Sequence, residues 1–380
     1  MTPSEGVTLL MFVGREVHSD VEEMLARANQ AVALDTIDRA LSLDECERIV
    51  VATNSAEFAA RLAELPVTVE VDEGNFHFGR RLAELIGRHC TRKPFYGGGG
   101  SMPLLDKGAF ASICRDLSAF ESVVIPNNLY SSDFVAFSPG EAIGRIAPPD
   151  TDNDLAFRLH RGAGLRNIPL PRTAATQMDV DTPTDLTILQ LHPRIGKHTA
   201  TFLRSLDLDV GPLRAVLQRM NDPTAELVVL GRIGAHAMVQ IEKNIACRTR
   251  VLSEEKGMRA SGRDQRGEVR SLAGLYLEAV GIPRFFEALP ELGQAALIDT
   301  RVIFEHFRFE VSAQDRYYSD LMDVDRIQHP FVRELTRAAK SASIPVVLGG
   351  HSLVAGGLLA LVEAAALTAS PAVQQSMSGT

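Results

Sequence analysis

Asp179 and Asp181 stand one residue apart in the run Met-Asp-Val-Asp-Thr-Pro-Thr-Asp-Leu (178–186). Side chains alternate along an extended chain, so these two carboxylates are expected to point to the same side. Two carboxylates that face one pocket repel each other, and a hard cation such as Mg²⁺ relieves that repulsion. The spacing therefore indicates a divalent-cation site. A purely structural role stays open, because residues 182–185 also form an ordinary helix start with an N-cap, an early proline and a first-turn acid.

A second segment, Tyr-Gly-Gly-Gly-Gly-Ser-Met-Pro-Leu-Leu-Asp (96–106), joins a glycine-rich run to a turn and a new helix. Together with residues 178–186 it resembles nucleotidyltransferases of the molybdenum-cofactor and phospholactate guanylyltransferase type. That family commonly has a Gly-Asp-x-Pro-Leu-Leu turn in mid-domain and an Asp/Asn-x-Asp/Asn-Thr-Pro-x-Asp-Leu run near the domain end. The resemblance covers roughly residues 7–192.

The resemblance implies a three-layer, Rossmann-like α/β domain over residues 1–198. It also implies Mg²⁺-dependent (or Mn²⁺-dependent) transfer of an NMP from an NTP to a small acceptor with a phosphate or carboxylate group, in a setting such as cofactor biosynthesis. Asp179 and Asp181 would hold the metal, and Arg15 and Asp181 are the implied catalytic residues. The implied nucleotide-binding residues are Gly14, Gly98, Gly99, Gly100, Ser101 and His77, the last with Asn75 as a reader of the base or the acceptor.

The chain departs from the family pattern at two places. Ser101 stands where the family has a metal-binding Asp. The family's phosphate loop, Leu-Ala-Gly-Gly followed by Arg and Lys, is reduced here to residues 9–15, and the first lysine of the chain is Lys93. Asp106 and Asp133 are the acids expected to replace the missing ligand. These departures leave open a second interpretation, a non-catalytic nucleotide- or metabolite-binding protein on the same fold.

The elements that would position these residues can be predicted from apolar periodicity. Short apolar runs alternate with helical patterns, which indicates βαβ units and a mainly parallel sheet. In the first half, strands are expected at 8–12, 48–53, 66–71, 93–100, 122–125 and 133–137, and helices at 21–41, 79–89, 107–117 and 155–160.

The alternation restarts in the second half, which predicts a second, doubly wound α/β domain over residues 199–380 that resembles no family. Strands are expected at 226–230, 249–252, 296–304 (with a possible helical continuation) and 344–348. Helices are expected at 235–243, 268–280, 332–340 and 353–366. Residues 299–301, Asp-Thr-Arg, are placed within the third of these strands.

Two strand ends of the second half carry glycine turns, at 230–236 and 348–353, where backbone N–H groups can approach an anion. Between them lies a polar loop, 253–267, whose Arg259, Arg263 and Arg266 could grip phosphate or carboxylate groups. The alternative for this loop is a solvated, mobile segment. A third interpretation therefore places the chemistry in the second domain, as a hydrolase or phosphate-handling enzyme.

Composition limits the classes of partner that the protein is expected to bind. The 380-residue chain has a net charge of −9, which argues against nucleic acid as a bulk partner, and its aromatic content of 6% argues against platforms that stack bases. Its four cysteines lack zinc-site spacing. The apolar stretch 346–368 is expected to be a buried strand-turn-helix, not a membrane span. A polar start without a signal peptide favours the cytoplasm. The oligomeric state stays open, with a homodimer as one candidate.

Overall fold

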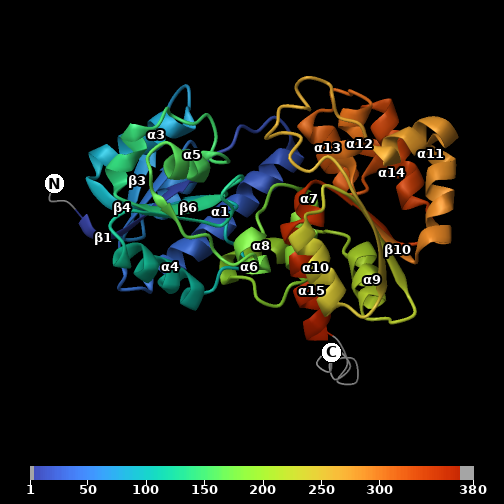
Figure 1. Ribbon diagram of the computed structural model, residues 1–380, viewed down its shortest axis with the longest axis horizontal. Coiled ribbons are helices and arrows are strands. Elements are labelled where there is room, and N and C mark those ends of the chain that lie inside the picture. Colours follow the sequence, from blue (N-terminus) through green and yellow to red (C-terminus); the bar gives the residue numbers. More distant parts are fainter. Residues whose placement is uncertain (1–3, 369–380) are drawn as a thin grey trace. The chain divides into compact units, whose positions relative to one another are not determined.

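The computed structural model describes residues 4–368, which group into two compact units (Figure 1). The first unit contains the residues up to Val17, Ala26–Asp179 and Gly196–Thr199. The second contains His18–Leu25, Val180–Ile195 and the residues from Ala200 on. The segment 178–186 therefore changes unit between Asp179 and Val180. The domain boundary between residues 198 and 199 stays a prediction from sequence.

The first unit is built on a seven-stranded sheet with the order β3-β2-β1-β4-β6-β5-β7. Neighbouring strands run parallel, except that β6 is antiparallel to both β4 and β5. The expected mainly parallel sheet is thus confirmed. The strands are β1 (Ser4–Phe12), β2 (Cys46–Thr53), β3 (Thr68–Val71), β4 (Thr91–Gly98), β5 (Val123–Pro126), β6 (Phe134–Ser138) and β7 (Arg166–Asn167).

Helices cover both faces of this sheet, and alternate side chains of β1 enter the two cores. Leu9 and Met11 pack into one core with helices α1 (Asp20–Leu41), α2 (Ala56–Leu62) and α4 (Lys107–Ala119). Leu10 packs into the other core with α3 (Phe78–Arg88), α5 (Leu155–Arg161) and the 3₁₀ helix η1 (Gly140–Arg145). The unit also contains the short helix α6 (Ala174–Gln177). This is a three-layer α/β arrangement, as expected for a parallel sheet.

The second unit is built on a four-stranded, fully parallel sheet with the order β11-β10-β8-β9. Apolar residues on one face of the sheet pack against α11 and α14. Helix α9 contacts β8, β10 and β11, and α15 packs on α9. The strands are β8 (Glu226–Gly231), β9 (Arg248–Ser253), β10 (Ala295–Asp299) and β11 (Val346–Gly349). The predicted doubly wound α/β class is confirmed.

The remaining helices follow the chain in order. They are α7 (Pro183–Leu191), α8 (Lys197–Arg204), α9 (Gly211–Met220), α10 (Ala235–Asn244), α11 (Leu272–Leu292), α12 (Thr300–His306), α13 (Ala313–Asp320), η2 (Val324–Arg326), α14 (Pro330–Lys340), η3 (Ser352–Val354) and α15 (Gly356–Thr368). Residues 346–368 form β11, η3 and α15, which confirms the predicted strand-turn-helix. Across residues 4–368, the structure contains no helix with the length and apolarity needed to cross a membrane.

Two sequence predictions about element boundaries are wrong. The expected strand 296–304 ends at Asp299, because the Asp299 side chain accepts the Arg301 N–H and starts α12. The helical continuation considered for this segment is present, and Thr300 and Arg301 lie in that helix and not in a strand. The apolar run after it is buried in a helix, and periodicity alone does not separate a short buried strand from a buried helix. The helix expected from residue 268 begins at Leu272, because the Ser271 hydroxyl accepts the Gly274 N–H.

Candidate functional site

The carboxyl ends of β1 and β4 form the topological switch point of the first sheet. From β1 the chain crosses to β2 on one side, whereas β4 lies on the other side. In open α/β sheets, ligands bind at the carboxyl ends of the strands, at the point where the strand order reverses. Gly14 and Arg15 follow β1 here, and Gly99–Ser101 follow β4. The fold therefore brings two of the predicted segments to the edge where a ligand is expected.

One backbone hydrogen bond joins these two turns, and another ties the turn after β1 to β2. The Gly99 N–H donates to the Phe12 carbonyl at 2.9 Å, and the Val13 N–H donates to the Ala52 carbonyl at 2.8 Å. Gly14 lies against Asn54, so that a Cβ at Gly14 would be 2.7 Å from the Asn54 Oδ1 atom. A Cβ at Gly98, by contrast, would have only the Tyr96 hydroxyl within 4 Å, at 3.9 Å. Gly14 packs closely against the Asn54 side chain, whereas Gly98 leaves open space at the edge.

The two motif segments that carried the family resemblance meet at Ser101. Ser101 and Asp179 form an isolated antiparallel β-bridge, so Asp179 is fixed by backbone pairing and not by a strand. The Ser101 side chain is buried, and its hydroxyl donates to the Gly98 carbonyl at 2.8 Å. Ser101 thus closes the glycine-rich turn. Asp179 keeps partial solvent exposure next to it, while its neighbours Met178 and Val180 are buried.

An aromatic cluster lies at the carboxyl end of β1, and the sequence patterns described above do not predict it. The Phe12 ring makes edge-on contacts with Phe76, Phe78 and Tyr96 at centroid distances of 5.5, 5.7 and 5.4 Å. Phe76 is 57% exposed, which leaves an aromatic face accessible beside the glycine turns. Low aromatic content therefore does not prevent a stacking surface for a single base. The Phe-His-Phe spacing at 76–78 was the available signal.

The same turn carries His77, the residue expected to read the base or the acceptor. Its Nε2 atom lies 3.5 Å from the Asp150 Oδ1 atom, and its side chain is 30% exposed. His77 precedes α3 without a side-chain cap. Because neighbouring Phe76 contacts Phe12, the segment 74–77 belongs to the carboxyl edge together with the glycine turns.

The two acids named as replacement ligands have structural partners. Asp106 caps α4 by accepting the Ala109 N–H at 2.8 Å. The Asp133 Oδ2 atom accepts from the Asn127 side chain at 2.7 Å.

Asp181 groups with the second unit and is exposed. Within residues 4–368 no three His, Cys, Asp or Glu side chains gather in a metal-binding cluster. The metal role of Asp179 and Asp181 stays a prediction, and Mg²⁺ typically needs only one or two carboxylates beside substrate phosphates and water.

The second sheet has its own switch point, between β8 and β10, and it is occupied by a buried ion pair. The Arg232 Nε and Nη2 atoms donate to the two Asp299 oxygens at 2.6 and 2.9 Å. Both residues are almost fully buried. Burial alone would raise the pKa of Asp299, but the adjacent Arg232 guanidinium overcomes this and holds that pKa below its usual value. Gly231, with φ of +128°, permits the approach, since a Cβ there would lie 2.4 Å from the Asp299 Cβ.

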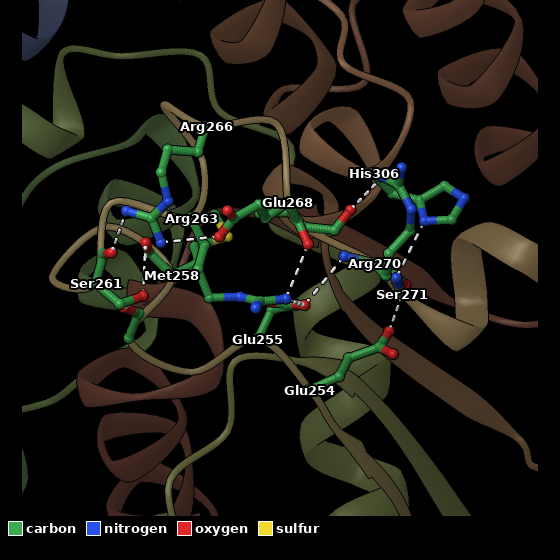
Figure 2. A network of polar contacts seen from close by, with 12 residues as sticks. Glu254, Glu255, Met258, Ser261, Arg263, Arg266, Glu268, Arg270, Ser271 and His306 are labelled. Atoms are coloured by element: carbon green, nitrogen blue, oxygen red, sulfur yellow. Dashed lines mark hydrogen bonds and ion pairs between the residues drawn. The ribbon is translucent and has the colours of Figure 1, made fainter.

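The arginine-rich loop 253–267 is folded by its own ion pairs (Figure 2). Arg263 donates to both Glu255 oxygens at 3.0 and 2.8 Å, and Arg266 donates to Glu268 at 2.8 Å. The Arg263 hydrogen bonds hold the pKa of Glu255 below its usual range. Arg263 and Arg266 therefore stabilise the loop, and their guanidinium groups are paired with glutamates instead of being available to a phosphate. Arg259 is different: its side chain is 68% exposed, and its Nε atom lies 4.0 Å from Asp264.

The comparisons with known proteins give structural similarity without a family. No protein-family model matches the chain, and no curated protein matches it. Among solved structures, it is similar to a nucleotidyl transferase from Methanothermobacter thermautotroptrophicus (12% identity, 53% of this chain and 100% of that chain, TM-score 0.38). It is also similar to a cytidylyltransferase from Leptospira borgpetersenii (12%, 53% and 92%, TM-score 0.36). A third is 4-diphosphocytidyl-2C-methyl-D-erythritol synthase from Anaerococcus prevotii (11%, 43% and 86%, TM-score 0.32).

Proposed function

We propose that this protein is a nucleotidyltransferase that binds an NTP at the carboxyl edge of β1 and β4 and transfers its NMP to a small acceptor with a phosphate or carboxylate group. The observation that carries the proposal is the convergence of separate segments at one switch point. The turn after β1, the glycine turn after β4, the aromatic turn 74–77 and Asp179 all lie at this edge. These segments are far apart in the sequence, and the fold brings them together.

Each segment has a role in this proposal. The open space beside Gly98 would admit the phosphates, and Arg15 would neutralise their charge. The exposed ring of Phe76 would stack on the base, with His77 beside it. Such catalysis depends mainly on positioning and on electrostatic stabilisation of the phosphate charge.

Mg²⁺ fits the donor set available here. The Asp179 carboxylate is partly exposed beside the Ser101 turn, and carboxylate oxygen is a ligand that Mg²⁺ prefers. When bound, the ion would supply charge neutralisation for the NTP phosphates. The metal role of Asp181 stays a prediction from its spacing in the sequence.

We predict that Asp179→Asn lowers transfer activity by about 100-fold or more, because a lost metal ligand removes several kcal/mol of charge stabilisation. The measurement is release of pyrophosphate from each NTP with Mg²⁺ and a set of phosphate- and carboxylate-bearing acceptors. Asp116→Asn, an exposed acid on α4, is the matched control and should keep full activity. Equal activity of wild type and Asp179→Asn would remove Asp179 from the mechanism.

The rival proposal is a protein that binds a nucleotide but does not transfer it. The observation that favours it is the Ser101 hydroxyl, which donates to the Gly98 carbonyl in place of a family metal ligand. NTP binding without pyrophosphate release for any acceptor would support this rival.

A further inference from the structure

Asn29 places an unpaired polar atom beside the two turns that follow β1 and β4. The residue lies on α1 and belongs to the first unit, as both turns do. Its Oδ1 atom is buried and has no hydrogen-bond partner among the described residues. A Cβ built on Gly99 would lie 3.5 Å from the Asn29 Cβ atom and 3.1 Å from the Val13 Cγ1 atom, so the Asn29 side chain packs against the glycine turn. A buried amide oxygen without a donor costs free energy, and it therefore calls for a specific explanation.

The donors of the two neighbouring turns are already used. The Val13 N–H donates to a carbonyl near the end of β2 at 2.8 Å, and the Gly99 N–H donates to the last carbonyl of β1 at 2.9 Å. Both the N–H and the hydroxyl of Ser101 donate to the Gly98 carbonyl, at 3.2 and 2.8 Å. These bonds hold the two turns in place. The group that pairs with the Asn29 oxygen is therefore expected to come from a ligand.

The proposed substrate limits what this group is. Under the proposed function the NTP phosphates enter the space beside Gly98, which adjoins Gly99 in the chain. Phosphate oxygens are acceptors, so a phosphate in direct contact with the Asn29 oxygen would be repelled. Hydrated Mg²⁺ removes this conflict, because the ion takes oxygen ligands from protein and phosphate alike and its bound waters donate hydrogen bonds. The unpaired oxygen therefore fits the cation that accompanies an NTP.

We propose that the Asn29 amide oxygen binds the hydrated Mg²⁺ of an NTP–Mg²⁺ complex, an inference that rests on the proposed nucleotidyltransferase function. Asn29 thereby takes the part expected of Asp106 and Asp133, whose carboxylates already have structural partners. An amide oxygen carries no net charge, so it attracts the ion less than a carboxylate does. We therefore expect the site to take up Mg²⁺ together with the NTP phosphates, with Asn29 as a binding residue and not as a catalytic one.

The test compares NTP affinity in excess Mg²⁺ with NTP affinity in EDTA, measured by isothermal titration of the full chain with each of the four NTPs. The ratio of the two affinities isolates the contribution of the cation. Asn29→Ala should reduce this ratio at least about tenfold for the NTP that binds wild type, because one oxygen ligand is lost. Asn29→Asp, which keeps an oxygen at this position, should preserve the ratio. Gln30→Ala is the control and should match wild type, since successive side chains of a helix point about 100° apart.

The melting temperature without ligand separates this role from a structural one. Asn29→Ala should melt at or above the wild-type temperature, because an unpaired buried oxygen is removed and alanine favours a helix. A lower melting temperature would show that the amide already has a partner in the folded chain, and it would overturn the proposal.

Three results of the titration would also overturn it. An unchanged ratio in Asn29→Ala would remove Asn29 from the cation site and leave the NTP site intact. Equal loss of affinity in Mg²⁺ and in EDTA would show that Asn29 contacts the nucleotide itself. Loss of the ratio in Asn29→Asp as well would show that the amide group acts as a donor. The absence of affinity of wild type for every NTP would instead refute the proposed function, and this inference with it.

Discussion

Asp299→Ala is expected to lower the free energy of unfolding by about 3–5 kcal/mol, the range observed when one partner of a buried ion pair is removed. The variant leaves the buried Arg232 guanidinium without its two carboxylate contacts at 2.6 and 2.9 Å. It also removes the cap that accepts the Arg301 N–H at the start of α12. The measurement is urea unfolding of the full chain, followed by circular dichroism.

Two control variants distinguish the effect of losing the ion pair from a general sensitivity of this unit to substitution. Glu291→Ala breaks an exposed pair with Arg284, which should change stability by no more than about 1 kcal/mol. The double variant Arg232→Met with Asp299→Leu should recover most of the loss, because a well-packed apolar pair commonly replaces a buried ion pair. A loss below about 1 kcal/mol in Asp299→Ala would contradict this account of the switch point.

Asp185 should make stability depend on pH in the acid-to-neutral range. Its Oδ2 atom accepts the N–H groups of Asp181 and Thr182 at 3.0 and 2.8 Å, and the residue is fully buried. Burial raises the pKa of Asp185 to about 7 from an ordinary value of 3.8. The folded state therefore binds a proton that the unfolded state releases between these pH values. This contribution is complete below pH 3.8 and is lost as the pH rises through 7.

The expected slope is about −1.4 kcal/mol per pH unit, which amounts to roughly 4 kcal/mol over the whole window. Asp185→Asn is the matched control, because it retains a side-chain oxygen and cannot titrate. Stability measured for both proteins from pH 4 to pH 7.5 isolates the effect, since other titrating groups cancel in the difference. Parallel curves would show that the proton is not taken up by Asp185.

Local patterns predicted most of the fold because strands and helices of this chain differ clearly in length and periodicity. The apolar run at residues 8–12 became β1 (Ser4–Phe12), and the pattern from residue 21 became α1 (Asp20–Leu41). The failure at residues 299–304 has a local cause. A single capping side chain, Asp299, turns an apolar run into a helix, and hydrophobicity does not report that change.

The candidate sites were predictable only in part, because their partners are distant in the sequence. The resemblance paired residues 96–106 with 178–186, but the direct bridge between Ser101 and Asp179 required the fold. Arg232 and Asp299 are 67 residues apart, and no local pattern links them. No local pattern indicates that Arg263 stabilises its loop through Glu255. The Phe12–Phe76 contact could not be predicted either, because it joins a strand end to a turn that is distant in the sequence.

The most direct test of the NTP site is the melting temperature of wild type and Gly98→Ala with each of the four NTPs, with and without Mg²⁺. The added methyl of Gly98→Ala meets only the Tyr96 hydroxyl at 3.9 Å, so the melting temperature without ligand should not change. Gly87→Ala, with nothing within 4 Å of the added methyl, is the control.

We expect one NTP with Mg²⁺ to stabilise wild type and Gly87→Ala by about 2.7 kcal/mol at 100 times its dissociation constant. Gly98→Ala should lose most of that stabilisation, because its methyl group occupies the space at the carboxyl edge of β4. The absence of a shift with every NTP, or an equal shift in Gly98→Ala, would contradict an NTP site at the carboxyl edge of β1 and β4.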